Sequence, residues 1–202
     1  MAYPTVSAPY GLKPVNLIGG QVFAGATRLM EIASGYATSI FYGDLVKRVA
    51  AGTIEKDVGT SAATPCGIFL GVQFTNGSTG QVQQQQFYPA SQAIKSGSQI
   101  FAVVADDPDT LFQVVSCSGT TVVAGMGISA IGNNIALIQN AGSTTTGNSA
   151  VAIDEGTQAT TSSLPIRIID VVRETATGAD TFVEFIVKIN ATMHQYNNST
   201  GV

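Results

Sequence analysis

The side chains able to do acid–base or metal chemistry are few and scattered. His194 is the single histidine of the 202 residues, and no Gly-x-Ser-x-Gly nucleophile elbow accompanies it. A metal site based on histidine needs more ligands than one imidazole and the separated thiols of Cys66 and Cys117 offer. We therefore expect His194 to be a surface or interface residue, and we expect no catalytic residue, metal or other cofactor.

Three carboxylates gather in one acidic stretch, at Asp106, Asp107 and Asp109. Carboxylate oxygens can bind Ca²⁺, but this stretch lacks the twelve-residue pattern of an EF-hand loop. It also lacks an apolar setting that would raise a carboxyl pKa for general acid or base catalysis. We interpret the three residues as solvated carboxylates in a turn between two strands.

One glycine pattern resembles a cofactor motif. Residues 125–130 read Gly-Met-Gly-Ile-Ser-Ala, which matches the G-x-G-x-x-A of dinucleotide-binding folds. Gly132, Asn133 and Asn134 interrupt the chain where the required helix would run. The glycines therefore indicate a bend or bulge between strands.

The two cysteines lie in apolar contexts typical of strands. Cys66 stands in Pro-Cys-Gly-Ile-Phe and Cys117 in Val-Val-Ser-Cys-Ser. Because the chain has no dense cysteine framework, we expect two buried thiols and no disulfide.

Charge excludes some partners. The net charge is −4, and the nine Lys and Arg residues form no cluster that could bind phosphates, so we expect no nucleic acid partner. Charged residues make up 11% of the chain, where about a quarter is usual. Charges are depleted from interface cores, so this composition fits a protein covered by neighbours; a neutral extracellular or viral β protein without a special partner fits equally.

Targeting signals are absent from the sequence. No apolar stretch reaches the roughly 18 residues of a membrane span, and the N-terminus has no signal-peptide pattern. We expect a soluble protein without a membrane partner, made in a cytoplasm.

The element that organises the chain is the stretch 164–190. Two runs rich in β-branched and aromatic residues flank a polar turn at 173–180, which predicts an antiparallel pair of strands. In the second run the alternate residues form one apolar face, because side chains alternate across a strand; these are Val183, Phe185, Val187 and Ile189. We expect that face in the core, and the mixed opposite face against solvent or another subunit.

The sequence outside 164–190 predicts short strands separated by turns that contain Gly, Asn and Pro. Residues 68–74 alternate most clearly, residues 45–57 read as a hairpin, and 100–105 and 111–115 read as strands around the acidic turn. No amphipathic helix exceeds about two turns, so the pattern of about ten strands predicts an all-β fold, an antiparallel barrel or sandwich with little helix. We expect one β-rich domain over residues 21–195.

The two ends differ from this domain. Prolines at positions 4, 9 and 14 favour extended backbone and predict an N-terminal arm over residues 1–20, with a disordered leader as the alternative. Residues 196–202 read as a polar C-terminal tail.

Several segments together resemble a known family. Ser7–Gln21 reads Ser-Ala-Pro-Tyr-Gly-Leu-Lys-Pro-Val-Asn-Leu-Ile-Gly-Gly-Gln, and Ile40–Val46, Pro65–Gly71 and the ending from Pro165–Ile169 to Val187–Asn190 follow in order. In this order they resemble head decoration (cement) proteins of tailed bacteriophages that infect marine and freshwater bacteria, including cyanophages. The resemblance spans most of the chain. It implies a β-rich homo-oligomer, often a trimer, on the outside of the virion capsid, bound to the major capsid protein and without cofactor or active site.

With that role, the N-terminal arm is the expected capsid contact. Stiff, proline-containing segments lose less entropy on docking, and aromatic residues dominate interface energies. The expected contact residues are Tyr3, Pro4, Pro9, Tyr10, Leu12 and Leu17.

Three alternatives remain. The chain could be another structural virion protein, such as a tail-tube or head-completion protein that forms rings. It could be a module that recognises carbohydrate on a host surface, although it has no tryptophan for sugar stacking. An enzyme acting through the acidic turn is the third, and we expect substitution of its three aspartates by asparagine to change no assayable property.

Overall fold

The fold is all-β, as the sequence predicts. A computed structural model describes residues 8–118, 126–176 and 182–201, and these residues form strands and three single-turn 3₁₀ segments with no α-helix among them. The strands are β1 (Lys13–Leu17), β2 (Arg28–Ile32), β3 (Leu45–Arg48), β4 (Ile54–Lys56), β5 (Gly67–Thr75), β6 (Val82–Gln85), β7 (Ile100–Ala105), β8 (Thr110–Cys117), β9 (Asn134–Ile135), β10 (Leu137–Ile138), β11 (Ala152–Asp154), β12 (Ile166–Val171) and β13 (Glu184–Ile189). The 3₁₀ segments are η1 (Ile128–Ala130), η2 (Glu155–Thr157) and η3 (Arg173–Thr175).

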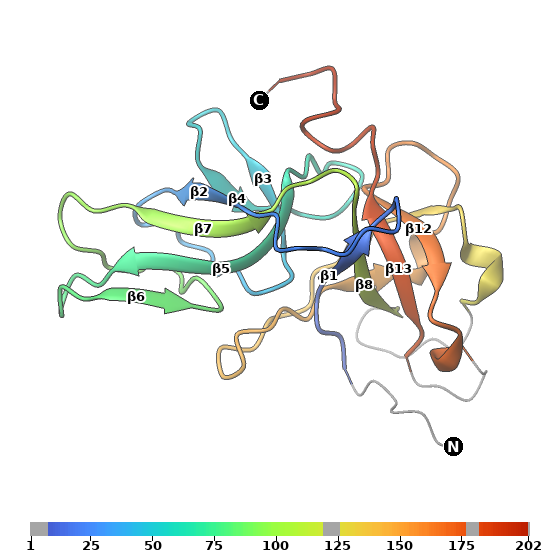
Figure 1. Cartoon of the computed structure of the whole chain (residues 1–202), viewed down its shortest axis with the longest axis horizontal. Coiled ribbons are helices and arrows are strands. Elements are labelled where there is room, and N and C mark those ends of the chain that lie inside the picture. The colour runs from blue at the N-terminus through green and yellow to red at the C-terminus, as the bar shows by residue number, and fades with distance from the viewer. Residues whose placement is uncertain (1–7, 119–125, 177–181, 202) are drawn as a thin grey trace.

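One sheet closes into a small barrel. Its order is β3-β4-β2-β7-β5-β6, and β3 pairs with β5 as well as with β4. The extra pairing closes β3, β4, β2, β7 and β5 on themselves and leaves β6 as an edge strand (Figure 1). The barrel interior is filled by alternate apolar residues of these strands, including Phe69, Phe74 and Ile100, together with Tyr88 from a loop.

The second sheet has the order β10-β11-β8-β13-β12-β9, with β1 paired to β8. Strands β12 and β13 form the predicted antiparallel pair, in which Ile168 lies opposite Val187. The predicted core face is confirmed, because Val183, Phe185, Val187 and Ile189 are all buried. The turn residues 177–181 lie outside the described part of the chain.

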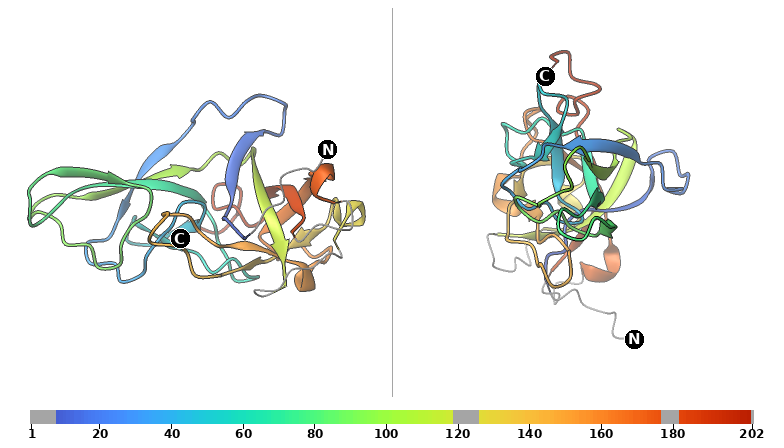
Figure 2. Two further views of the ribbon diagram at one scale, coloured as in Figure 1. Left: turned by 90° about the horizontal axis from the view of Figure 1, so that it is seen from below. Right: turned by 90° about the vertical axis from the view of Figure 1, so that its left-hand side faces the viewer.

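The two sheets share a core. The chain passes from β7 in the barrel to β8 in the second sheet through the acidic turn. The two sheets lie toward opposite ends of the long axis of the molecule (Figures 1 and 2). Leu45, Ile68 and Ala105 of the barrel strands belong to the same buried cluster as Phe112 and Phe185.

A buried ion pair adds a polar link between the sheets. Asp44, fully buried, accepts hydrogen bonds from the backbone N–H of Phe41 (2.8 Å) and from Ser149 Oγ (2.6 Å). Lys56 Nζ lies 2.9 Å from its Oδ2. The barrel and the loop that leads to β11 are thereby tied to one carboxylate.

Both ends of the chain are more integrated than expected. Lys13–Leu17, assigned to the arm from the sequence, forms β1 and pairs with β8. At the other end, Tyr196 donates a hydrogen bond to Asp106, so the polar tail begins after Tyr196. The local sequence of these two segments does not show that one will pair with the edge of β8 or that the other will donate to the buried Asp106.

Candidate interaction surface

The predicted contact residues fall in different places. Tyr3 and Pro4 lie outside the described residues. Leu12 is wrong as a surface anchor, since its side chain is fully buried in the core shared by the two sheets. Leu17 is half-buried at the end of β1. An apolar residue in an extended segment can face its own core or a partner, and the local pattern does not distinguish them.

Two backbone contacts hold the segment around Leu12. The N–H of Leu12 donates to the carbonyl of Gly43 (3.0 Å), and the N–H of Gly11 donates to the carbonyl of Val151 (3.1 Å). Gly11 has φ +81°, and a Cβ there would lie 2.7 Å from Cβ of Ser149. The close approach therefore requires glycine.

Tyr10 is an anchor within its own chain. Its hydroxyl donates to Oε1 of Glu184, a buried carboxylate on the central strand β13. Nζ of Lys13 lies 4.1 Å from the centre of the Tyr10 ring, a cation–π contact. Burial, followed by the hydrogen bond and negative charge of Glu184, raises the pKa of the Tyr10 phenol far above its usual value. The phenol stays protonated and acts as a donor, not as a base or nucleophile.

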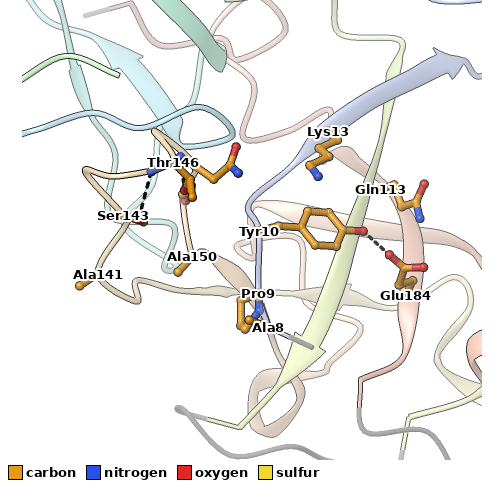
Figure 3. Close-up of a pocket in the computed structure, with 12 residues that line it drawn as sticks. Ala8, Pro9, Tyr10, Lys13, Gln113, Ala141, Ser143, Thr146, Ala150 and Glu184 are labelled. Atoms are coloured by element: carbon orange, nitrogen blue, oxygen red, sulfur yellow. Dashed lines mark hydrogen bonds between the residues drawn. The ribbon is translucent and has the colours of Figure 1, made fainter. Parts of the chain in front are cut away.

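A cleft lies beside this cluster. It has a volume of about 830 Å³ and is lined by Pro9 and Tyr10, by Gln113 and Glu184, and by the loop 141–150. Figure 3 shows the Tyr10 ring turned toward Glu184, with the loop residues on the other side of the N-terminal segment. Pro9 and Tyr10 therefore line a cleft of their own domain, beside the polar side chains of Gln113 and Glu184.

The acidic turn is structured rather than solvated at Asp106. That side chain is buried and accepts from Tyr196 while pairing with Nε of Arg28 at 2.8 Å. The interpretation of solvated carboxylates is therefore wrong for Asp106, because two donors distant in sequence converge on it. Asp109 remains exposed and pairs with Lys188 at 3.1 Å.

His194 is also misassigned by the sequence. Its side chain is fully buried, and Nδ1 accepts a hydrogen bond from the backbone N–H of Tyr196. Burial lowers the pKa of the imidazole, with a smaller opposing effect of Asp106. The side chain of the next residue, Gln195, forms two hydrogen bonds with the backbone of Arg48. These bonds hold the C-terminal segment against the end of β3.

The cysteine prediction is confirmed. Cys66 and Cys117 are buried thiols, and burial raises the pKa of Cys66 to about 12. The glycine motif gives no nucleotide site within the described residues, since Ile128–Ala130 is a single 3₁₀ turn; Gly125 lies outside them. Among the described side chains, no group of three or more His, Cys, Asp or Glu is placed to hold a metal ion.

Three exposed apolar residues lie in or directly after the predicted arm, although none of them is among the expected contact residues. Val15, Ile18 and Val22 are 37%, 50% and 77% exposed. They belong to one hairpin, because Asn16 pairs with Val22 and the N–H of Leu17 donates to the carbonyl of Gln21. We call Val15, Ile18 and Val22 the N-terminal ridge.

The ridge continues into an exposed, uncharged crossover. Every residue from 18 to 27 is exposed except Phe23, and no charged residue lies between Lys13 and Arg28. The crossover projects from the body in both views of Figure 2, on its way from β1 to β2. That run without charges is the sequence signal that could have revealed the ridge.

Comparison with protein-family models, curated proteins and solved structures finds no match to this chain. In the described residues, no helix has the length and apolar character needed to cross a bilayer.

Proposed function

We propose that this chain is a structural virion protein of a tailed bacteriophage, a decoration protein that binds the outer surface of the major capsid protein lattice and stabilises the head. The observation that carries the proposal is the N-terminal ridge with its uncharged crossover. A projecting apolar surface without charges has the composition of an interface core. The resemblance of the segments quoted above to phage decoration proteins supports the same role.

The physical logic is mass action. A partner that binds only the assembled lattice stabilises that lattice by a free energy that rises with the logarithm of its free concentration over its dissociation constant. A homo-oligomer, for which a trimer is the expectation from the resemblance, multiplies each contact through effective concentration. Burying three aliphatic side chains of the ridge contributes about 1.5–3 kcal/mol each when burial is complete.

The structure changes how the contact is tested. Removing residues 1–18 would delete β1 and the buried Leu12, so that truncation would perturb the fold together with any capsid contact. Removing residues 1–7 instead takes away Tyr3 and Pro4 and leaves β1 in place. Their contribution as capsid contacts stays a prediction, separate from that of the ridge.

The experiment is co-sedimentation with expanded phage heads that lack the protein. The double variant Ile18→Asp with Val22→Asp should weaken attachment at least 100-fold, because two carboxylates would be desolvated in an apolar contact. Ile128→Asp is the matched control, since Ile128 is 59% exposed but lies in η1, distant in sequence from the ridge. Full occupancy by the double variant would remove the ridge from the proposal, and failure of the wild-type protein to bind would remove the proposal itself.

A further inference from the structure

The barrel presents a second surface that is poor in charged residues. On the outside of the barrel, Leu29 of β2 lies opposite Val103 of β7, which lies opposite Gly71 of β5. A second row runs from Glu31 through Phe101 and Gln73 to Gln84 of β6. Residues directly opposite each other in antiparallel strands share a face. We call this surface the outer barrel face; it comprises Leu29, Glu31, Leu70, Gln73, Thr75, Val82, Gln84, Phe101 and Val103.

The face combines apolar and amide side chains. Its one charged residue, Glu31, accepts a hydrogen bond from Nε2 of Gln99. Gln84 Nε2 lies 3.4 Å from Gln73 Oε1, and this amide pair separates two hollows of about 320 and 210 Å³. The first hollow lies at Gly71, where no side chain fills the surface. The face therefore has both relief and hydrogen-bonding groups.

Among the described residues, strand β6 borders this face as the last strand of its sheet. It pairs with β5 on one side and ends the sheet, and Val82 is 63% exposed. Edge strands pair with other chains unless Lys, Pro, a bulge or a covering segment prevents it. The sequence of β6, Val-Gln-Gln-Gln, contains neither Lys nor Pro.

We propose that the outer barrel face, with its β6 edge, is the surface through which copies of this chain associate with one another. Glutamine amides both donate and accept, so a face built from them satisfies itself in a second copy. The chain carries net charge −4, and a face with a single carboxylate adds little repulsion between two copies. A nucleic acid would require cations here, and a basic partner would require more than one carboxylate. The inference deepens the proposed function by naming the contact between copies.

The test is light scattering on the free full-length protein after size-exclusion chromatography. The wild type should have a mass of two or more 20.8 kDa chains. The double variant Val82→Lys with Gln84→Lys should elute at the single-chain mass, because lysines on an edge oppose pairing. Ile128→Lys is the matched control, similar to Val82 in exposure but outside the barrel, and it should keep the wild-type mass.

A second measurement does not depend on a variant. Amide hydrogen exchange in the wild type should slow in β6 as protein concentration rises, while the exposed crossover 18–27 should exchange at an unchanged rate. A single-chain mass for the wild type, a lysine variant that stays associated, or β6 exchange independent of concentration would each overturn the inference.

The two proposals fail separately. A single-chain protein that still sediments with heads would refute the self-association surface and leave the capsid role intact. A wild-type multimer that does not sediment with heads, and whose lysine variant is a single chain, would refute the capsid role and leave the self-association surface intact.

Discussion

Substitution of Gly11 by alanine tests how the N-terminal segment is held. Gly11 has φ +81°, and an added Cβ would lie 2.7 Å from Cβ of Ser149 and 3.0 Å from Cα of Gly43. Both groups belong to segments distant in sequence, and the Gly43 contact is with backbone, which cannot rotate away. The substitution should therefore disturb the point where the N-terminal segment meets both sheets.

The expected loss of unfolding free energy in Gly11→Ala has two parts. A left-handed conformation at a residue with a Cβ costs about 1–2 kcal/mol, and overpacking a tight contact costs about 1–3 kcal/mol more. Gly20 supplies the control, because its φ is also +81° but nothing lies within 4 Å of its Cβ position. Gly20→Ala should lose only the first part, about 1–2 kcal/mol, while Gly11→Ala should lose about 2–5 kcal/mol.

The assay is denaturant unfolding of the two variants beside the wild type, with hydrogen exchange of residues 8–17 as a local readout. The unfolded-state effect of replacing glycine by alanine is the same in both, so their difference isolates the packing at Gly11. Equal losses of unfolding free energy in the two variants would refute the packing described here. Faster exchange of β1 in Gly11→Ala alone would support it.

Three further predictions concern the buried polar groups. Tyr10→Phe leaves the buried Glu184 without its phenol donor and should lower the unfolding free energy by about 1–3 kcal/mol in denaturant melts; an unchanged midpoint would contradict the hydrogen bond. Asp44→Ala removes a fully buried carboxylate that pairs with Lys56 and should cost about 3–5 kcal/mol, whereas Asp109→Ala removes a carboxylate that is 66% exposed and should cost less than about 1 kcal/mol; similar losses would argue against a buried pair at Asp44. His194 is the single histidine and burial lowers its pKa, so the unfolded chain takes up the proton first, and its contribution to stability is present above about pH 6.5 and is lost over the pH window below that value. His194→Gln should show a flatter dependence of melting temperature on pH across that window, and an equal slope in both proteins would contradict this assignment.

The sequence predicts what local periodicity determines. The β12–β13 pair, the β3–β4 hairpin and the core face around Phe185 follow from alternation and turn residues, and all are present. Burial of the two thiols follows from their apolar neighbours. None of these depends on which distant strand lies beside which.

The errors arise where distant segments meet. Leu12 belongs to the core only because β1 pairs with β8. His194 is buried only because the C-terminal segment folds back, and Asp106 is desolvated because Arg28 and Tyr196 converge on it. Closure of the barrel likewise depends on β3 meeting β5. No pattern within a short window contains these pairings.

Electron cryo-microscopy of expanded heads incubated with the purified protein tests the capsid role most directly. The account predicts density for this chain on the outer surface of the shell at a fixed number of copies per capsid subunit, with the N-terminal ridge against the lattice. A shell without added density, density restricted to the neck or tail, or bound copies whose ridge faces solvent would contradict it.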